Sequence, residues 1–519
     1  MLSRAIRPNR AIRGPVFQPN PVSSRRTGSS LRLQAQVADV SKGIDTDGCS
    51  LPAFIGNPNV QSEPSVVGPI GTPPYDSPGA AKLENVLANT VSFELQSGRD
   101  EFWRKVPYWA DVTAKDFLSY RWSLQVLATH DSSLHSSVWD IVLLTSMIWQ
   151  VANTVQGTVK LFKFLQTVVP EEVPVDKLGM QMQSRDEFIK DVLDGVAAAT
   201  MAIRMTPYIL SRINWLDPRH DPIARQFLPM KSIMLPDHPK LTLDSLHETA
   251  DSPVKGLASL KPTRRRWEEA FAYIESRPEL QDIVVSGGDS YYLQPEQLTL
   301  IGERLISLPN IKRFRFASKG LAVAPTRILD ESDGWVNALI DISNKAKKAG
   351  KSMALHTHFN SPNEISWISS DASQKLFENG VMVRNQTVLL RGVNDDYETM
   401  STLIRQLADN NITPYYVYQC DLVERVEHLR TPLQTILDLE AKIRGSIAGF
   451  MTPSFVVDLP GGGGKRLACS YQSYDRDTGV STFVAPAVTG RDKADKVYEY
   501  YDPVDMLPEA SRGVYKSSI

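Results

Sequence analysis

The feature that most constrains the fold is an alternation of short apolar strands and helical stretches from about residue 260 onward. Helical stretches such as 331–348 and 396–410 lie between the strands. This alternation predicts an α/β fold, in which helices cover a parallel sheet that is open or closed into a barrel. In both forms the working residues lie at the carboxyl ends of the strands. The expected strands are Asp282–Val285, Lys312–Ala317, Ser352–His356, Val381–Leu390, Pro414–Gln419 and Phe455–Asp458.

The residues on either side of this region have other patterns. Residues 82–240 are predicted to form a mostly helical amino-terminal domain. Within it, Asp186–Met205 has apolar residues at helical spacing, and Pro207 is expected to end that helix. The alternating region is predicted to be one domain, 241–470, followed by a carboxyl-terminal extension, 471–519.

The amino-terminal residues 1–38 are basic. They carry seven arginines, and the first acidic residue is Asp39. Serines are frequent and no long apolar stretch is present, which is typical of a mitochondrial transit peptide and not of a secretory signal. We therefore expect a mitochondrial location; a plain basic tail is the alternative. Residues 39–81 are rich in Pro, Gly and Ser and are expected to be a disordered linker.

The composition excludes several classes of partner. A formal net charge of −2 gives no reason to expect nucleic acid or an anionic membrane, and no apolar run approaches the ~18 residues of a membrane span. The chain has three cysteines, Cys49, Cys420 and Cys469, far apart in the sequence. This set argues against a disulfide framework and supplies no clustered thiolates for a metal.

Four consecutive glycines, 461–464, follow an apolar strand and precede Lys465. Glycine lets the backbone adopt positive φ and approach a ligand closely. A lysine at the end of such a loop can form a Schiff base with an aldehyde cofactor. A phosphate-binding P-loop fails on spacing, because it needs Gly in place of Leu459 and Ser or Thr in place of Arg466. A flexible surface linker is the remaining alternative.

Other polar segments also follow predicted strands. The aromatic strand 415–420 ends in Asp421, a pattern that can form the wall of a pocket and hold a cation. The turn 286–289 contains two glycines, which leave backbone groups open to a ligand. His356 and His358 share one face of a strand, but no third ligand has the spacing for a metal site.

Together these segments resemble the lysine 2,3-aminomutase family, and they occur in the family's order. The resemblance runs from Asp282 to Lys465, with a weaker match from Thr206 to Gly256. The segments that carry it are SGGD at 286–289, THFNSPNEI at 357–365, NQTVLLRGVND at 385–395, PYYVYQCDL at 414–422, RTP at 430–432 and GGGGK at 461–465.

The resemblance implies an incomplete (β/α) partial barrel of the radical S-adenosylmethionine (SAM) type, preceded by a mostly helical region. It implies that Lys465 holds pyridoxal phosphate (PLP) covalently. Asp421 and Asp458 correspond to two carboxylates that bind the distal ammonium of a lysine substrate, which argues against a glutamate-specific relative. A homo-oligomer is expected.

Two further sets of contacts follow from the resemblance. The segment around Tyr208 and Arg225 resembles, more loosely, the one that meets the PLP phosphate. The residues that correspond to SAM contacts are Ser286, Gly287, Gly288, Asp289, His358 and Gln386.

In this family a reduced [4Fe–4S] cluster cleaves SAM to a 5′-deoxyadenosyl radical. The radical takes hydrogen from carbon 3 of the PLP-bound amino acid, and the nitrogen migrates from carbon 2 to carbon 3, so that L-lysine and L-β-lysine interconvert. The cluster is held by a C-x3-C-x2-C loop after the first barrel strand. Here Leu257 runs into residues 258–262 instead, so the cysteine loop and that strand are both absent. The family's carboxyl-terminal cysteines are absent too, and we expect no zinc.

A second anomaly is the segment 127–150, which fits neither of its flanks and is expected to lie loosely on the surface. A retained intron and a skipped exon in the inferred coding sequence would explain both anomalies, and sequencing of the transcript tests this hypothesis. Two alternatives to a lysine enzyme stay open: a catalytically inactive PLP-binding paralogue, and an aminomutase for another amino acid. Without the first strand, we expect the sheet to start at Asp282–Val285, after a short connection over 258–262, and the chain to fold poorly alone.

Overall fold

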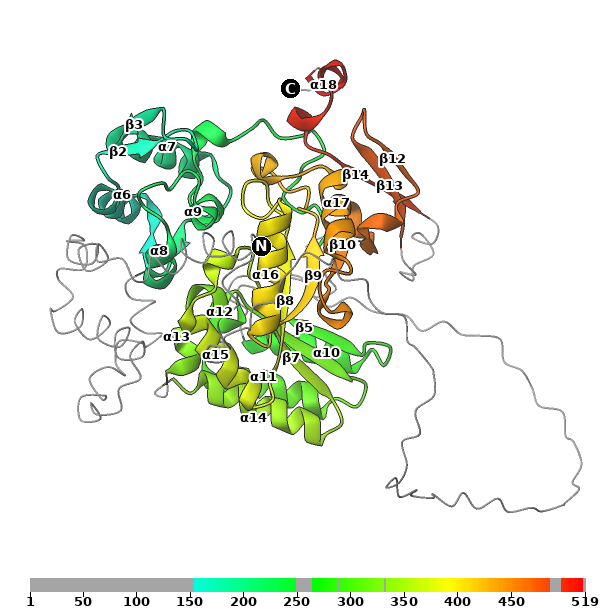
Figure 1. The fold of residues 1–519 in the computed structure, drawn as a ribbon. Coiled ribbons are helices and arrows are strands. Elements are labelled where there is room, and N and C mark those ends of the chain that lie inside the picture. Colours follow the sequence, from blue (N-terminus) through cyan, green and yellow to red (C-terminus); the bar gives the residue numbers. More distant parts are fainter. Residues whose placement is uncertain (1–153, 249–263, 287–288, 331–332, 486–495, 517–519) are drawn as a thin grey trace, which may run out of the picture. The chain divides into compact units, whose positions relative to one another are not determined.

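The structure is a computed structural model that describes residues 154–248, 264–286, 289–330, 333–485 and 496–516. Its centre is a seven-stranded sheet with the order β11-β10-β9-β8-β7-β6-β5 (Figure 1). Strands β5 to β10 are parallel, and β11 is antiparallel to β10. The strands are β5 (Asp282–Val285), β6 (Arg313–Ala317), β7 (Ser352–Thr357), β8 (Met382–Val388), β9 (Thr413–Tyr418), β10 (Ser454–Leu459) and β11 (Gly464–Leu467).

The six expected strands are all present, with bounds that differ from the expected ones by no more than two residues. The mixed α/β sheet is curled and consistent with a partial barrel, as the sequence predicts. Among the described residues the sheet begins at β5, which was also expected. The strand β11 was not predicted: Lys465 lies on it and not in a loop.

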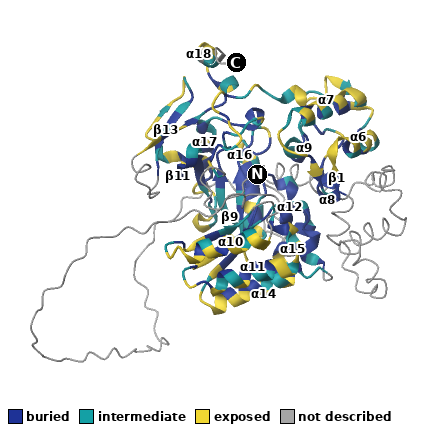
Figure 2. Ribbon diagram, turned by 180° about the vertical axis from the view of Figure 1, so that it is seen from behind, coloured by how far each residue is buried: buried dark blue, intermediate teal, exposed yellow. Residues whose placement is uncertain are grey.

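Helices pack against one face of the sheet because alternate strand residues are apolar on that face. In β6, Phe314 and Phe316 join a buried core with Trp335, whereas Arg315 between them is only partly buried. Side chains alternate between the two faces of a strand, so Arg315 lies on the opposite face of the sheet. Figure 2 shows the buried positions. The helices are α10 (Arg264–Glu275), α11 (Pro295–Ser307), α12 (Gly320–Val323), α13 (Thr326–Leu329), α14 (Trp335–Lys348), α15 (Trp367–Glu378), α16 (Tyr397–Asp409) and α17 (Leu433–Ile443).

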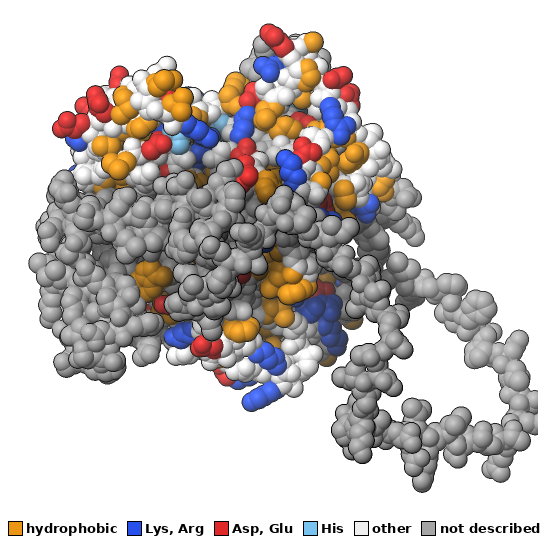
Figure 3. Space-filling model, viewed as in Figure 1, with side chains coloured by type: hydrophobic (Ala, Val, Ile, Leu, Met, Phe, Trp, Pro, Cys, Tyr) orange, Lys and Arg blue, Asp and Glu red, His pale blue; other side chains and the backbone are white. Residues whose placement is uncertain are grey.

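A run of three arginines, 264–266, lies at the start of the helix before the sheet. Residues 264–266 open α10, and the Arg265 side chain is 89% exposed and pairs with Glu269 at 3.1 Å. Figure 3 shows acidic and basic side chains interspersed over the described surface in that view, in keeping with the small net charge.

Upstream of the sheet, the described residues combine helices with short strands. The helix predicted over Asp186–Met205 ends earlier, and Pro207 does not end it: Pro207 opens α8, whose first turn is capped by the Thr206 hydroxyl. Met205 pairs with Val155 in a small antiparallel sheet, so this segment is extended where periodicity indicated a helix. The elements are β1 (Val155–Gln156), α6 (Gly157–Val168), β2 (Glu172–Pro174), β3 (Met182–Ser184), α7 (Arg185–Ala198), β4 (Arg204–Met205), α8 (Pro207–Arg212) and α9 (Pro222–Phe227).

The carboxyl-terminal extension packs against the end of the large sheet. It forms an antiparallel sheet of β12 (Ser473–Asp475), β13 (Val480–Val484) and β14 (Val497–Tyr501), followed by α18 (Glu509–Lys516). The Tyr500 hydroxyl donates to the Cys420 carbonyl at 2.8 Å, and the fully buried Arg430 pairs with Glu427 and with the Tyr501 carbonyl. These contacts fix the chain just beyond β9.

Several sequence predictions fall on residues outside the described part: the transit peptide 1–38, the linker 39–81, the segment 127–150, the connection 258–262, and Gly287 and Gly288. They stay predictions, as do the domain boundaries. Among the described helices, none has both the length and the apolar character needed to cross a bilayer.

Candidate functional site

The lysine that the sequence singled out faces a carboxylate across a β-hairpin. Lys465 on β11 is the register partner of Asp458 on β10, and its Nζ donates to Asp458 Oδ2 at 2.7 Å. The Asp458 side chain is 2% exposed and that of Lys465 is 15% exposed. The Lys465 Nζ also lies 4.8 Å from the ring centroid of Tyr418 on β9. The amine is therefore held by charge and by an aromatic face, and it keeps some access to solvent.

The glycine run that joins these strands is a defined turn. Gly461, Gly462 and Gly464 have positive φ, and a Cβ on Gly463 would lie 2.6 Å from the Leu459 Cβ. The Gly461 N–H donates to the Ser245 carbonyl at 2.7 Å, which ties the turn to the upstream chain. The turn leads into a strand and not a helix, so the segment is neither a P-loop nor a free linker.

The second predicted carboxylate, Asp421, follows the neighbouring strand. Tyr418, the last residue of β9, is the register partner of Val456 on β10. Asp421 therefore follows the end of β9 near the level of Asp458, the residue before the last of β10. Burial, with the charge of Asp421 beside it, raises the pKa of the Cys420 thiol to about 12, so this thiol is un-ionised at neutral pH. The two carboxylates thus belong to adjacent strand ends of one sheet.

An irregularity in β9 changes which aromatic side chains meet. The register shifts between Asn385 and Gln386 of β8, and the rings of Tyr415 and Tyr416 then lie 3.9 Å apart with their hydroxyls 3.0 Å apart. Strict alternation would place consecutive tyrosines on opposite faces. The Arg384 guanidinium lies 5.4 Å from the Tyr415 ring. Arg384 and the two tyrosines therefore form an aromatic and basic cluster next to Gln386, a predicted SAM contact and the register partner of Tyr416.

At the other end of the sheet, Asp289 accepts hydrogen bonds from two backbone N–H groups. Its Oδ1 accepts the Tyr291 N–H at 2.8 Å and its Oδ2 accepts the Lys319 N–H at 2.9 Å. Burial raises the pKa of Asp289, and hydrogen bonds from Ser318 and these backbone groups oppose that effect. Asp289 therefore joins the backbone at Tyr291 to the backbone at Lys319, and a direct SAM contact stays a prediction.

Lys319 and Glu364 join the segments predicted to meet SAM, and the sequence reasoning missed both. Lys319 Nζ donates to the His358 carbonyl and to Glu364 Oε1, each at 2.8 Å. Glu364 is fully buried and also accepts the N–H groups of Asn360 and Ser361. Lys319 follows the end of β6, so the rule that working residues lie at strand ends would have selected it.

Of the two histidines near the end of β7, His356 is buried and His358 is partly buried, and both are neutral. Burial, with Arg315 and Arg384 nearby, lowers the pKa of His356 to about 2. Burial and the Lys319 ammonium hold the pKa of His358 well below its usual range. Among the described residues, His358 Nε2 has no hydrogen-bond partner although it is buried, which suits a ligand contact.

Tyr208 and Arg225 are the residues predicted to meet the PLP phosphate. Tyr208 contacts the residue after segment 357–365, and Arg225 contacts segment 385–395; both segments carry the resemblance to the family. Tyr208 is buried, and its hydroxyl lies 2.6 Å from Ser366 Oγ. Arg225 packs against Gly392, at which φ is positive and an added Cβ would lie 2.7 Å from the Arg225 guanidinium carbon. Among the described residues, Arg225 Nε is buried without a hydrogen-bond partner. An anionic group would satisfy it, so Arg225 fits the predicted role better than Tyr208 does.

The residues present fit PLP and do not fit an iron–sulfur cluster. Lys465 offers a partly accessible amine, and Arg225 offers a buried Nε that has no hydrogen-bond partner among the described residues. In contrast, the described residues contain no group of three or more His, Cys, Asp or Glu that could hold a metal. The whole sequence has three cysteines and no C-x3-C-x2-C motif; Cys420 is buried and Cys469 is exposed.

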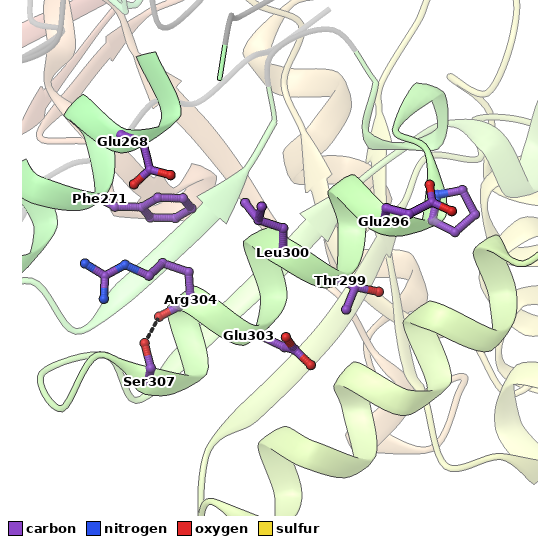
Figure 4. A pocket seen from close by; sticks show the side chains of 9 residues that line it. Glu268, Phe271, Glu296, Thr299, Leu300, Glu303, Arg304 and Ser307 are labelled. Carbon is purple, nitrogen blue, oxygen red and sulfur yellow. Dashed lines mark hydrogen bonds between the residues drawn. The ribbon is translucent and has the colours of Figure 1, made fainter. Parts of the chain in front are cut away.

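A pocket of about 690 Å³ lies elsewhere, on the outer helical layer between α10 and α11 (Figure 4). Phe271, Leu300 and Arg304 line it together with several glutamates. None of the predicted site residues lines this pocket, so it has no part in the chemistry considered below.

Comparison with known proteins finds relatives in the family that these segments resemble. No family model matches the chain. The chain is 35% identical over 350 residues to the L-lysine 2,3-aminomutase of Clostridium subterminale, covering 61% of this chain and 76% of that protein. It is 34% identical over 348 residues to the enzyme of the same name from Acetoanaerobium sticklandii, with the same coverage. It is 33% identical over 198 residues to the glutamate 2,3-aminomutase of Clostridioides difficile, covering 38% of this chain and 44% of that protein. The chain therefore belongs to the lysine 2,3-aminomutase family, whose members are isomerases.

Proposed function

We propose that this protein is an amino acid 2,3-aminomutase that holds PLP through Lys465 and takes L-lysine as its substrate, with L-β-lysine as the product. The observation that carries the proposal is the Lys465–Asp458 pair at the end of the sheet, behind a turn that requires glycine. When bound, PLP supplies an aldehyde that condenses with amines and a ring that delocalises electrons from the reacting carbon.

The chain's own residues prepare the amine for that role. Asp458 Oδ2 holds the Lys465 ammonium, and it is positioned to accept a proton when the amine attacks an aldehyde carbon. The Tyr418 ring covers one side of the amine and restricts water there. Arg225, with its unsatisfied Nε, is the candidate for the cofactor's phosphate.

The choice of L-lysine over an acidic amino acid rests on charge. Asp421 and Asp458 leave adjacent strand ends, where two carboxylates favour a substrate whose side chain ends in a cation. The family also contains a glutamate 2,3-aminomutase, whose named substrate ends in an anion. Another amino acid with a distal cation is the alternative substrate.

The second candidate function is that of a PLP-binding protein without radical chemistry. It is favoured by one observation, the absence of any C-x3-C-x2-C motif from the sequence. Without that motif the polypeptide has no clustered thiolates for an iron–sulfur cluster. Ser286, Asp289, His358 and Gln386 stay candidates for SAM contacts. Iron and labile-sulfide analysis after anaerobic reconstitution separates the two functions. Clustered iron at a near-stoichiometric level would exclude the second candidate function.

Borohydride reduction of the PLP-loaded protein, followed by peptide mapping, tests the central assignment. We expect the label on Lys465 and no label in Lys465→Arg, which keeps the charge of the side chain. A label that persists in Lys465→Ala would overturn the assignment.

We also propose a mitochondrial location and a homo-oligomeric state. The arginine-rich, acid-free residues 1–38 support the first, and import of a reporter fused to them tests it. The second rests on the resemblance alone, and light scattering of the purified protein measures it directly.

A further inference from the structure

In the structure, the carboxylate proposed to bind the substrate's distal cation is already engaged. Asp458 Oδ2 lies 2.7 Å from Lys465 Nζ, in an ion pair that is almost fully enclosed on the carboxylate side. The two residues are register partners in one hairpin, so the backbone sets their separation. Without the cofactor, the Lys465 ammonium thus occupies the place that a substrate ammonium would take.

The same carboxylate cannot serve both cations well. A substrate ammonium at hydrogen-bond distance from Asp458 would lie within a few ångströms of Lys465 Nζ, and like charges at that range repel strongly in a poorly solvated site. Lys465 and the substrate cation therefore compete for one position.

Capture of an aldehyde by Lys465 removes this competitor. The ammonium gives up one proton, which passes through Asp458 Oδ2 to solvent, and the neutral amine adds to the aldehyde carbon. Water then leaves, and a carbon–nitrogen double bond forms. The nitrogen no longer has three N–H donors to offer, so Asp458 becomes available to another cation.

We infer that Lys465 acts as an internal blocker of the substrate's cation site, so that the protein binds a diamino acid productively only after Lys465 has reacted with its aldehyde cofactor. This inference rests on the proposed function, because it takes Lys465 as the cofactor lysine and Asp458 as a substrate ligand. It adds an order of binding: aldehyde cofactor first, amino acid second.

The experiment measures binding of L-lysine to the full, cofactor-free chain by titration calorimetry, with norleucine as a ligand that lacks the distal amine. Lys465→Met removes the charge but keeps an unbranched side chain against Tyr418, and we expect it to bind L-lysine at least tenfold more tightly than the wild type. Lys465→Arg keeps the charge and should bind as weakly as the wild type. Asp458→Asn should bind L-lysine no better than norleucine.

Equal affinity of the wild type and Lys465→Met for L-lysine, or no measurable binding to Lys465→Met, would overturn the inference. Far-ultraviolet circular dichroism of each variant shows whether it is folded. Lys465→Arg is the control for substitution at this position without loss of the charge, and its affinity for L-lysine is measured in the same assay. Failure of the proposed function looks different: borohydride would then leave Lys465 unlabelled in the wild type, whereas the gain in Lys465→Met would persist.

Discussion

The two ends of the large sheet differ in how their polar residues are used. At the β9–β11 end, Lys465, Asp458 and Tyr418 converge on one amine, and the carboxyl-terminal extension supports the chain nearby. At the β5–β7 end, Lys319 and Glu364 hold backbone groups of the neighbouring turns. The first end is arranged around one side-chain amine, and the second is arranged around backbone groups.

This difference separates the residues proposed for PLP from the place at which the cluster motif is missing. The residues of the β9–β11 end lie within about 50 positions of one another, between 415 and 467, and all are present. The β5–β7 end adjoins the place at which the family's cysteine loop and first strand are absent from the sequence. The residues proposed to hold PLP and the missing cluster motif therefore belong to opposite ends of the sheet.

The largest expected effect is at the β9–β11 end. In a version of the protein with the cysteine loop restored, Asp421→Ala or Asp458→Ala should weaken use of L-lysine by orders of magnitude. Removing one partner of a buried, charged contact costs on the order of 3–5 kcal/mol. Steady-state kinetics with L-lysine measure this loss, and unchanged kinetics in both variants would refute the role of the two carboxylates.

At the β5–β7 end, an effect of similar size should appear in stability. Glu364→Ala leaves the partly buried Lys319 without its carboxylate and removes the acceptor for two backbone N–H groups, so we expect a loss of about 3–5 kcal/mol in the free energy of unfolding. Glu364→Gln keeps an acceptor and should lose less. Urea unfolding measures both, and equal losses would show that the charge is unimportant.

His356 should make the stability depend on pH. Its pKa falls from 6.5 to about 2 on folding, so the unfolded chain binds the proton first as the pH drops. The contribution of neutral His356 to the free energy of unfolding is therefore complete above pH 6.5. Below pH 6.5 it decreases by up to about 1.4 kcal/mol for each pH unit. Between pH 7 and pH 5, His356→Asn should therefore lose less stability than the wild type. His247→Asn, at an exposed site, is the matched control and should follow the wild type.

The smallest expected effect tests the glycine turn. Gly463→Ala places a Cβ 2.6 Å from Leu459 and 2.8 Å from Tyr498, and it should destabilise the protein by about 1–3 kcal/mol through overpacking. Gly449→Ala meets no atom within 4 Å and does not have positive φ, so it should change stability by less than about 0.5 kcal/mol. Thermal melts of the two variants compare them. Similar melting temperatures would mean that the turn tolerates a side chain.

Much of the fold could be predicted from local patterns. The period of apolar residues located β5 to β10 because each strand buries alternate side chains under helices. The same period located the helix that starts near Asp186 but not its end: α7 ends at Ala198. Met205 pairs with Val155 instead of continuing the helical pattern, and Thr206 caps a new helix at Pro207. Propensity is a weak signal where a tertiary partner competes with it.

The sequence by itself determined the order of strands and helices, the glycine turn before Lys465 and the lack of a cysteine motif, because these depend on residues close together in the chain. Only the tertiary structure decided that Asp458 faces Lys465, that Lys319 joins Asp289 to His358, and that a shift in register brings Tyr415 onto Tyr416. Such contacts follow from strand register and from how loops fold over strand ends, and these depend on packing across the whole sheet.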